Sequence, residues 1–148
     1  MKYITVVICF TAIVCFNSCK KGNAVKNTSN NTSITGTWEL ESAYGGTPLV
    51  QYPSGNGNNY AFTDSGYKKY TKGNLVKSGY YTIVEDTSVR EEVGLLIFPG
   101  QFTNRIIFDG DASAKKIFIE ILNDKLTFLA GFFPLDGGSS MTYKRNGN

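Results

Sequence analysis

The fold is decided by one alternating stretch near the C-terminus, Ile117-Phe118-Ile119-Glu120-Ile121-Leu122-Asn123-Asp124-Lys125-Leu126-Thr127-Phe128. Every second residue from Ile117 to Ile121 is isoleucine, and Leu126 and Phe128 flank Thr127. Successive side chains of a strand point to opposite faces, so a period of two in β-branched and aromatic residues predicts strands. Asn123-Asp124-Lys125 supplies turn chemistry. The stretch therefore predicts two strands joined by a tight turn.

The same alternation continues through the chain after Ile34, where 17 residues are aromatic. No stretch of ten or more residues shows helical apolar spacing, and turn signals recur about every 8–12 residues. The predicted strands cover residues 36–44, 58–63, 67–72, 77–84, 91–98, 103–109, 115–122, 125–130 and 139–146. Because the connections are short, the sequence predicts an all-β fold, an antiparallel up-and-down (meander) β-barrel of eight or nine strands.

The first nineteen residues have the layout of an export signal. Lys2 precedes an uncharged, mostly apolar run from Ile4 to Phe16, and Asn17-Ser18-Cys19 follows. The run is shorter than the roughly 20 residues that span a bilayer. Ser18-Cys19 resembles the cleavage site of bacterial lipoproteins, although Phe16 stands where leucine is usual. The resemblance implies that residues 1–18 are removed and that Cys19 is lipidated; an ordinary secretory signal is the alternative.

Residues 19–33 form a polar linker between this anchor and the domain. They are rich in Asn, Ser and Thr and nearly free of large apolar groups, which predicts a flexible segment. Lys20 is not the aspartate that retains some lipoproteins at the inner membrane. The resemblance therefore implies a cell-envelope location, anchored in the outer membrane on its periplasmic face.

The domain at residues 34–148 holds no cysteine, so its core must stabilise it without disulfides. It contains 11 Lys+Arg and 12 Asp+Glu, a net charge of −1. A nucleic-acid binder carries a dense basic face, so we expect no nucleic-acid partner.

Short motifs are spread over most of the domain. They are Gly36-Thr37-Trp38, Phe62-Thr63-Asp64-Ser65-Gly66, Gly79-Tyr80-Tyr81-Thr82-Ile83, the stretch Ile119 to Phe128, and Tyr143-Lys144-Arg145. Together they resemble lipocalins and the small lipocalin-like lipoprotein domains of Bacteroidetes. In lipocalins an arginine of the last strand stacks on the first-strand tryptophan at the closed end of the barrel. The resemblance implies this role for Arg145 on Trp38, with Lys144 as the alternative if the register slips.

A second resemblance starts from the same tryptophan. Gly36-Thr37-Trp38-Glu39-Leu40 and Gly45-Gly46-Thr47-Pro48-Leu49 also resemble the start of the META domain, another lipoprotein module. That family carries a Gly-Cys-Asn motif in mid-domain. No cysteine follows Cys19 here, which favours the lipocalin-like interpretation.

The residue types of catalysis are scarce. The sequence has no histidine and no cysteine after Cys19, so the commonest general base and the thiol nucleophile are both missing. Gly55-Asn56-Gly57 is the one Gly-x-Gly candidate for a phosphate cradle, but it follows Tyr52-Pro53 and opens no helix. We interpret it as a loop.

Two carboxylate pairs remain. Glu91 and Glu92 are adjacent in a predicted strand and would point to opposite faces, and Asp109 and Asp111 flank a turn at Gly110. We therefore expect no enzyme, no metal site and no cofactor.

Two functions stay open. A barrel of about eight strands is just wide enough to be filled by side chains or to hold one small ligand. The parity of the strands selects six interior rings as ligand-binding candidates, Tyr44, Phe62, Tyr81, Phe108, Phe128 and Tyr143. These rings either line a site for a small apolar ligand or simply fill the barrel.

The alternative is an envelope interaction protein that recognises a protein or a glycan. Two predicted hairpins have apolar tips, at Leu96 to Phe102 and at Gly131 to Leu135. Exposed apolar patches often mark contact surfaces, whereas rings that fold back would plug the barrel ends. In a nine-strand meander these two tips are expected at opposite rims.

Overall fold

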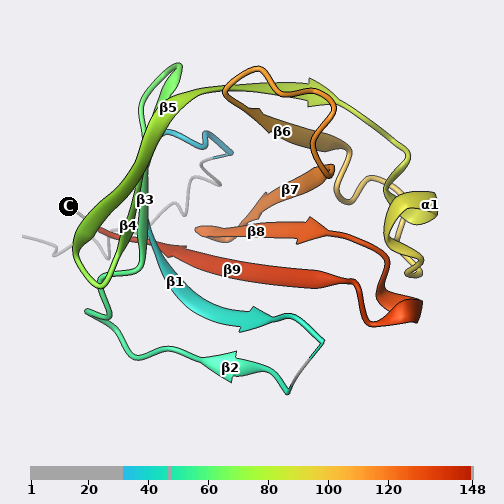
Figure 1. Ribbon diagram of the computed structural model, residues 1–148, viewed down its shortest axis with the longest axis horizontal. Coiled ribbons are helices and arrows are strands. Elements are labelled where there is room, and N and C mark those ends of the chain that lie inside the picture. Colours follow the sequence, from blue (N-terminus) through green and yellow to red (C-terminus); the bar gives the residue numbers. More distant parts are fainter. Residues whose placement is uncertain (1–31, 47, 148) are drawn as a thin grey trace, which may run out of the picture.

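The computed structural model describes residues 32–46 and 48–147 and shows a closed antiparallel barrel of eight strands (Figure 1). Strands follow one another around the barrel, and the last pairs with the first. The barrel strands are β1 (Gly36–Tyr44), β3 (Asn59–Phe62), β4 (Gly66–Thr71), β5 (Asn74–Glu85), β6 (Asn104–Phe108), β7 (Ile117–Leu122), β8 (Lys125–Ala130) and β9 (Ser139–Arg145). The predicted meander barrel is confirmed.

A ninth strand, β2 (Val50–Gln51), lies outside this ring and was not predicted. It pairs with Ser42 and Ala43 of β1, while β3 pairs with Gly36 to Glu39. Because β1 is long and β3 is short, the edge of β1 that β3 leaves free is covered by β2. The loop from residue 45 to 58 thus returns along the barrel wall before β3 begins.

The predicted strand at 91–98 is wrong. The segment forms a short helix, α1 (Val89–Val93), followed by a loop to β6. Val89 and Val93 are one helical turn apart and both buried, and Gly94 ends the helix in the left-handed region at φ 69°. Two apolar contacts four residues apart therefore outweigh the β propensity of the segment. Glu91 and Glu92 lie on the exposed side of this helix and not in a strand.

A β-bulge in β1 changes which of its side chains face inward. The pairing with β9 shifts register between Leu40 and Ser42, so the parity set by Trp38 and Leu40 is inverted beyond the bulge. Tyr44 was expected in the barrel interior. Instead it lies on the outer side, in register with Ser140, and its ring stacks on Phe133 with centroids 5.8 Å apart.

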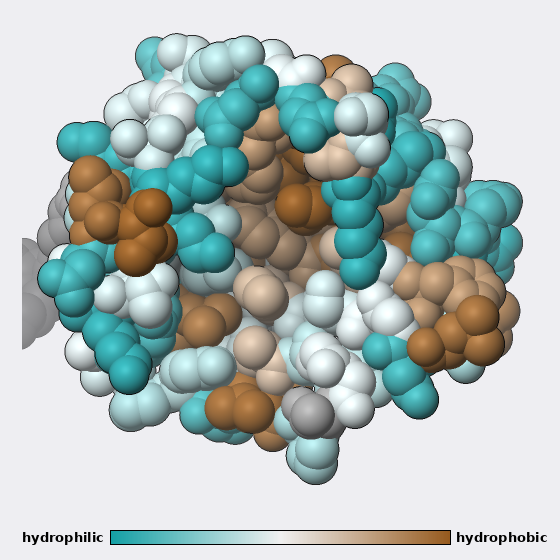
Figure 2. Space-filling model, viewed as in Figure 1, coloured by the Kyte–Doolittle hydropathy of each residue, from teal (hydrophilic) through white to brown (hydrophobic). Residues whose placement is uncertain are grey.

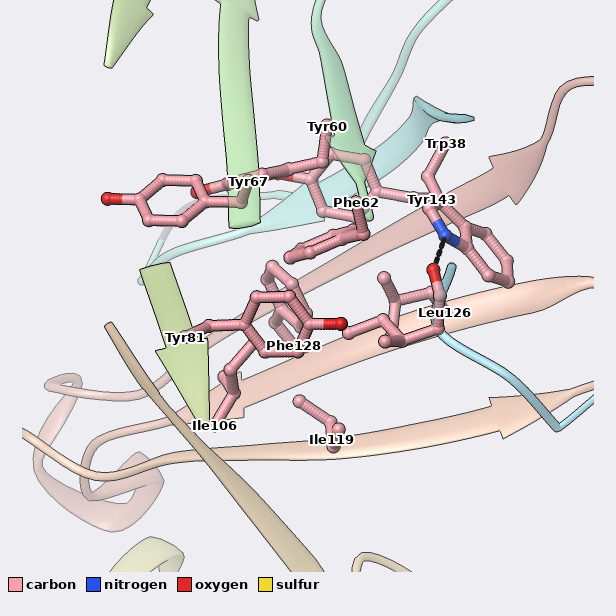
Figure 3. Close-up of a cluster of buried hydrophobic side chains, with 11 residues drawn as sticks. Trp38, Tyr60, Phe62, Tyr67, Tyr81, Ile106, Ile119, Leu126, Phe128 and Tyr143 are labelled. Carbon is pink, nitrogen blue, oxygen red and sulfur yellow. Dashed lines mark hydrogen bonds between the residues drawn. The ribbon is translucent and has the colours of Figure 1, made fainter. Parts of the chain in front are cut away.

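The apolar side chains form two cores. The larger core fills the barrel with rings and isoleucines from every wall (Figure 3). The smaller core lies on the outer side, where Phe118 and Leu129 are covered by Val89 and Val93 of α1. A 3-10 turn, η1 (Phe133–Leu135), lies beside α1 (Figure 1). Phe118 and Leu129, which point outward, are therefore as well buried as the inward residues of β7 and β8, which explains why both faces of these strands carry apolar residues there.

Candidate functional site

The end of the barrel where the chain enters is closed. Trp38 is fully buried, and its indole Nε1 donates to the carbonyl oxygen of Ile34 at 2.6 Å (Figure 3). The Arg145 guanidinium carbon lies 4.0 Å from the centroid of the Trp38 ring. Arg145 also donates to the carbonyl oxygens of Ser33 and Thr35 at 2.7 and 2.8 Å. These contacts hold the entering segment across the barrel, with Ile34 as part of the core.

Gly36 is required at this end. Its φ of 128° lies in a region that favours glycine, and a Cβ there would stand 2.9 Å from an Arg145 guanidinium nitrogen. Lys144, the other candidate for the tryptophan contact, pairs in register with Glu39 and is exposed.

The middle of the barrel is filled by side chains. The rings of Phe62 and Tyr81 lie 5.2 Å apart in an edge contact, and those of Phe108 and Phe128 lie 6.4 Å apart. The Tyr81 hydroxyl donates to the carbonyl oxygen of Thr63 at 2.7 Å. Four of the six expected ligand residues therefore contact one another or the backbone where a ligand was expected.

At the opposite end a hollow of about 290 Å³ remains, here called the open-end hollow. Its walls come from β1, β3, β4, β9 and the chain before β3, namely Leu40, Tyr52, Asn58, Asn59, Tyr60, Lys69, Tyr70, Thr71, Lys72, Met141 and Tyr143. Of the six expected residues, only Tyr143 lines it. Figure 2 views the molecule from a side that is hollowed near its centre, apolar in its depth and hydrophilic around its edge.

Two buried phenols face the open-end hollow. Burial raises the pKa of Tyr60 to about 12, and it raises the pKa of Tyr143 as well. Both stay neutral at physiological pH and can donate a hydrogen bond. The Tyr143 hydroxyl lies 3.6 Å from the Met141 sulfur, a weak acceptor. Within the described part of the chain the Tyr60 hydroxyl makes no hydrogen bond.

A second hollow, of about 310 Å³, opens between β6 and the loop that leads to β7. It exists because β6 pairs with β7 only up to Ile106, leaving Phe108 beside the gap. Its charged groups are paired. Asp109 accepts from Lys77 at 2.9 Å and from the Tyr67 hydroxyl at 3.0 Å, and the Lys77 bond lowers the pKa of Asp109.

The Asp109 and Asp111 carboxylates are both engaged within the chain. Asp111 accepts from the backbone N–H and the hydroxyl of Ser113 at 3.1 and 2.6 Å, which is turn chemistry. Among residues 32–46 and 48–147 no group of three His, Cys, Asp or Glu side chains is placed to hold a metal ion.

A larger hollow, about 660 Å³, is a polar fissure outside the barrel between residues 51–54 and the end of β9. Glu39, which lines this fissure, accounts for the Gly55-Asn56-Gly57 motif. The backbone N–H groups of Gly55 and Gly57 donate to the Glu39 carboxylate at 3.0 and 3.3 Å. The loop is thus an anion-binding turn that already holds a carboxylate of its own chain.

The two apolar tips meet on one side of the barrel, whereas opposite rims were expected. Ile97, Phe102 and Phe133 pack against the outer core beneath α1. We call α1 with residues 95–102 and 131–135 the apolar lobe. Not all of its large side chains are covered, since Leu96 is 93% exposed, Phe98 77% and Leu135 80%.

Three residues that line the open-end hollow, Lys69, Leu40 and Met141, were not predicted from the sequence as ligand-binding residues. The signal was present for Lys69, because it stands opposite Tyr60 once the turn at residues 63–66 is fixed. Leu40 faces inward with Trp38, and Met141 has the parity of the inward Tyr143 and lies opposite Phe128, so alternation within β1 and β9 could have found both.

Comparison with known proteins finds no match: no family model, no curated protein and no solved structure is significantly similar to this chain. Within the described residues no helix is long and apolar enough to cross a membrane. What the fold and the site define is the class of closed, eight-stranded antiparallel β-barrels with one plugged and one hollow end.

Proposed function

We propose that this protein is a membrane-anchored, lipocalin-like binding protein that holds one small, largely apolar ligand in the open-end hollow. The observation that supports this most is the contrast within the barrel. Side chains fill its middle and its entry end, while Leu40, Tyr60, Met141 and Tyr143 surround unfilled volume at the other end. Concave sites lined by apolar and aromatic groups with a few polar ones are typical of ligand pockets.

The size of the hollow limits the ligand. A volume of about 290 Å³ holds about ten non-hydrogen atoms if each takes about the 30 Å³ of a water molecule. Ligands of that size reach dissociation constants of roughly 1 mM to 1 µM. A long acyl chain does not fit unless the rings of the middle move.

A ligand screen tests this function. Native mass spectrometry and thermal shift with aromatic and aliphatic compounds of about ten atoms should give at least one 1:1 complex. The variant Met141→Trp fills the hollow and should abolish binding. Leu122→Trp, at an exposed position of β7, is the matched control and should bind normally. If no compound of the panel binds the wild type, the proposal is lost.

We further propose that Cys19 carries the membrane anchor; it lies outside the described residues. The described chain enters at the closed end, where Ser33 and Thr35 are held by Arg145. Because residues 19–33 are expected to form a flexible linker, this anchor would hold the barrel near the membrane without fixing its orientation. We place the protein at the periplasmic face of the outer membrane. Metabolic labelling with an alkyne fatty acid should mark the wild type and Cys15→Ala but not Cys19→Ala. Labelling that survives Cys19→Ala would contradict the anchor.

A second candidate function is supported by the apolar lobe. Leu96 and Phe98, which flank Ile97 in sequence, are both exposed, and such groups often mark a contact surface for an envelope protein or glycan. Leu96→Ser with Phe98→Ser removes them without touching the outer core, whereas Phe133 belongs to that core and is unsuitable. Leu75→Ser with Val76→Ser, at an exposed hairpin end, is the control. Loss of a cross-linked partner in the first pair alone would favour this function.

A further inference from the structure

Two lysines face each other on the inner side of the barrel near its open end. Lys69 of β4 and Lys77 of β5 are directly opposite in register. Lys69 also stands opposite Tyr60, and its ammonium lies 5.6 Å from the centroid of that inward-facing ring. Like charges opposite each other on one face of a sheet are destabilising, so negative charge nearby stabilises this pair.

The chain supplies a counter-charge to only one of them. Lys77 forms an ion pair with Asp109 at 2.9 Å. Lys69 has no carboxylate within ion-pair distance among the described residues. Its ammonium lies over the face of the Tyr60 ring, which offsets part of the cost.

The lining of the open-end hollow has the same bias. It includes Lys69 and Lys72 but no aspartate or glutamate. The fissure and the hollow beside β6 hold charges of both signs, with Glu39 and Glu41 in the first and Asp109 and Asp111 in the second. The two lysines of the open-end hollow, in contrast, have no carboxylate in the same lining.

We infer that the ligand of the open-end hollow is a small carboxylate with an apolar body, bound with its anion at Lys69 and its apolar part against Tyr60, Tyr143 and Leu40. This inference rests on the proposed function and names the ligand class of the same site. A carboxylate accepts a charge-assisted hydrogen bond from an ammonium. It also accepts from a neutral phenol, and the Tyr60 hydroxyl in this wall makes no hydrogen bond within the described chain.

A matched pair of ligands and a matched pair of variants test the inference. The probes are 3-phenylpropanoate and 3-phenylpropanol, which share the ring and chain and differ in the anion. The variants are Lys69→Gln and Lys68→Gln; Lys68 is the next residue of β4, exposed and facing outward. Both variants lose one positive charge, so only the position differs. Affinities are measured by isothermal titration at low and at high salt.

The wild type should bind the carboxylate about tenfold more tightly than the alcohol, which corresponds to about 1.4 kcal/mol. Lys69→Gln should remove this preference, Lys69→Arg should retain most of it, and Lys68→Gln should leave it unchanged. High salt should weaken the binding of the carboxylate and not that of the alcohol.

Two results would overturn the inference, and they are distinguishable. In the first, both probes bind equally, Lys69→Gln has no effect and Met141→Trp abolishes binding. This result keeps the binding function and contradicts a carboxylate as the ligand class. Binding of neither probe, nor of any compound in the wider screen, removes the proposed function itself.

Discussion

The two ends of the barrel satisfy their polar groups in different ways. At the closed end Trp38, Arg145 and the carbonyl oxygens of Ser33, Ile34 and Thr35 are partners of one another. At the open end the Lys69 ammonium and the Tyr60 hydroxyl have no hydrogen-bond or ion partner in the described chain, and neither has the buried Asn59 Oδ1. A buried polar atom without a partner, such as Asn59 Oδ1, costs about 1–3 kcal/mol. We infer that the closed end maintains the fold and that the open end is kept incomplete for a ligand.

The largest expected effect tests the closed end. Trp38→Ala removes a fully buried ring, its stacking on Arg145 and its hydrogen bond to Ile34. Loss of a buried tryptophan typically costs 3–5 kcal/mol, so urea unfolding should show a destabilisation of about that size or no folded protein. At the open end Met141→Ala should cost less than about 1 kcal/mol, because Met141 is 38% exposed. Equal losses of unfolding free energy in the two variants would contradict the idea that the closed end, and not the open end, maintains the fold.

The second effect separates the charge of Arg145 from its shape. Arg145→Lys keeps the charge but loses the planar stack on Trp38 and the fork that reaches Ser33 and Thr35. We expect a loss of about 1–3 kcal/mol in the free energy of unfolding. Lys144→Arg, next to it on the outer side, should change stability by less than about 0.5 kcal/mol. Indistinguishable unfolding curves for the two variants would mean that the charge alone matters.

Sequence predicted the closed end better than the open end, for a physical reason. Trp38 and Arg145 belong to strands whose alternation is regular up to Leu40, so period-two reasoning places them correctly. Beyond the bulge at Leu40/Ser42 one extra residue inverts the parity, and Tyr44 points outward. Nothing in the local sequence marks that bulge, because it follows from how β1 pairs with β9.

The helix α1 and the open-end hollow were not predicted from the sequence, for related reasons. Val89 and Val93 form an apolar pair too short to be recognised as a helix in sequence, and burial against Phe118 and Leu129 stabilises it. The hollow depends on which interior positions carry rings and which carry Leu40, Lys69 or Met141. That choice becomes visible only when the register of four strands is known.

The third effect concerns the side of the barrel, where charged residues stabilise the segment that leads into α1. Asp86 accepts from the Ser88 hydroxyl at 2.6 Å and pairs with Lys116 at 3.2 Å. The hydrogen bond from Ser88, followed by the charge of Lys116, lowers the pKa of Asp86 from 3.8 to about 2. A lowered folded-state pKa adds stability above the unfolded pKa, and this stability is lost as the pH falls through the folded pKa.

Asp86→Asn should therefore be less stable than the wild type by about 1–2 kcal/mol at pH 7. The difference should shrink below pH 3.8 and be nearly gone at pH 2, the two pKa values of Asp86. Thermal unfolding across this range measures it, and Glu91→Gln, an exposed acid of α1, should show no such trend. A difference that persists at pH 2 would contradict the assignment to Asp86.

The smallest effect compares a tyrosine of the filled part of the barrel with one at the open end. The Tyr81 hydroxyl donates to the Thr63 carbonyl oxygen at 2.7 Å, so Tyr81→Phe should cost about 1 kcal/mol. The Tyr60 hydroxyl has no such partner in the described chain, so Tyr60→Phe should be neutral or slightly stabilising without ligand. With 3-phenylpropanoate bound, the order should change, because Tyr60→Phe then loses a donor to the carboxylate. Chemical denaturation with and without the ligand measures both. If Tyr60→Phe lowers the free energy of unfolding of the ligand-free protein, the Tyr60 hydroxyl already has a hydrogen-bond partner. The open end would then hold no free donor for a ligand.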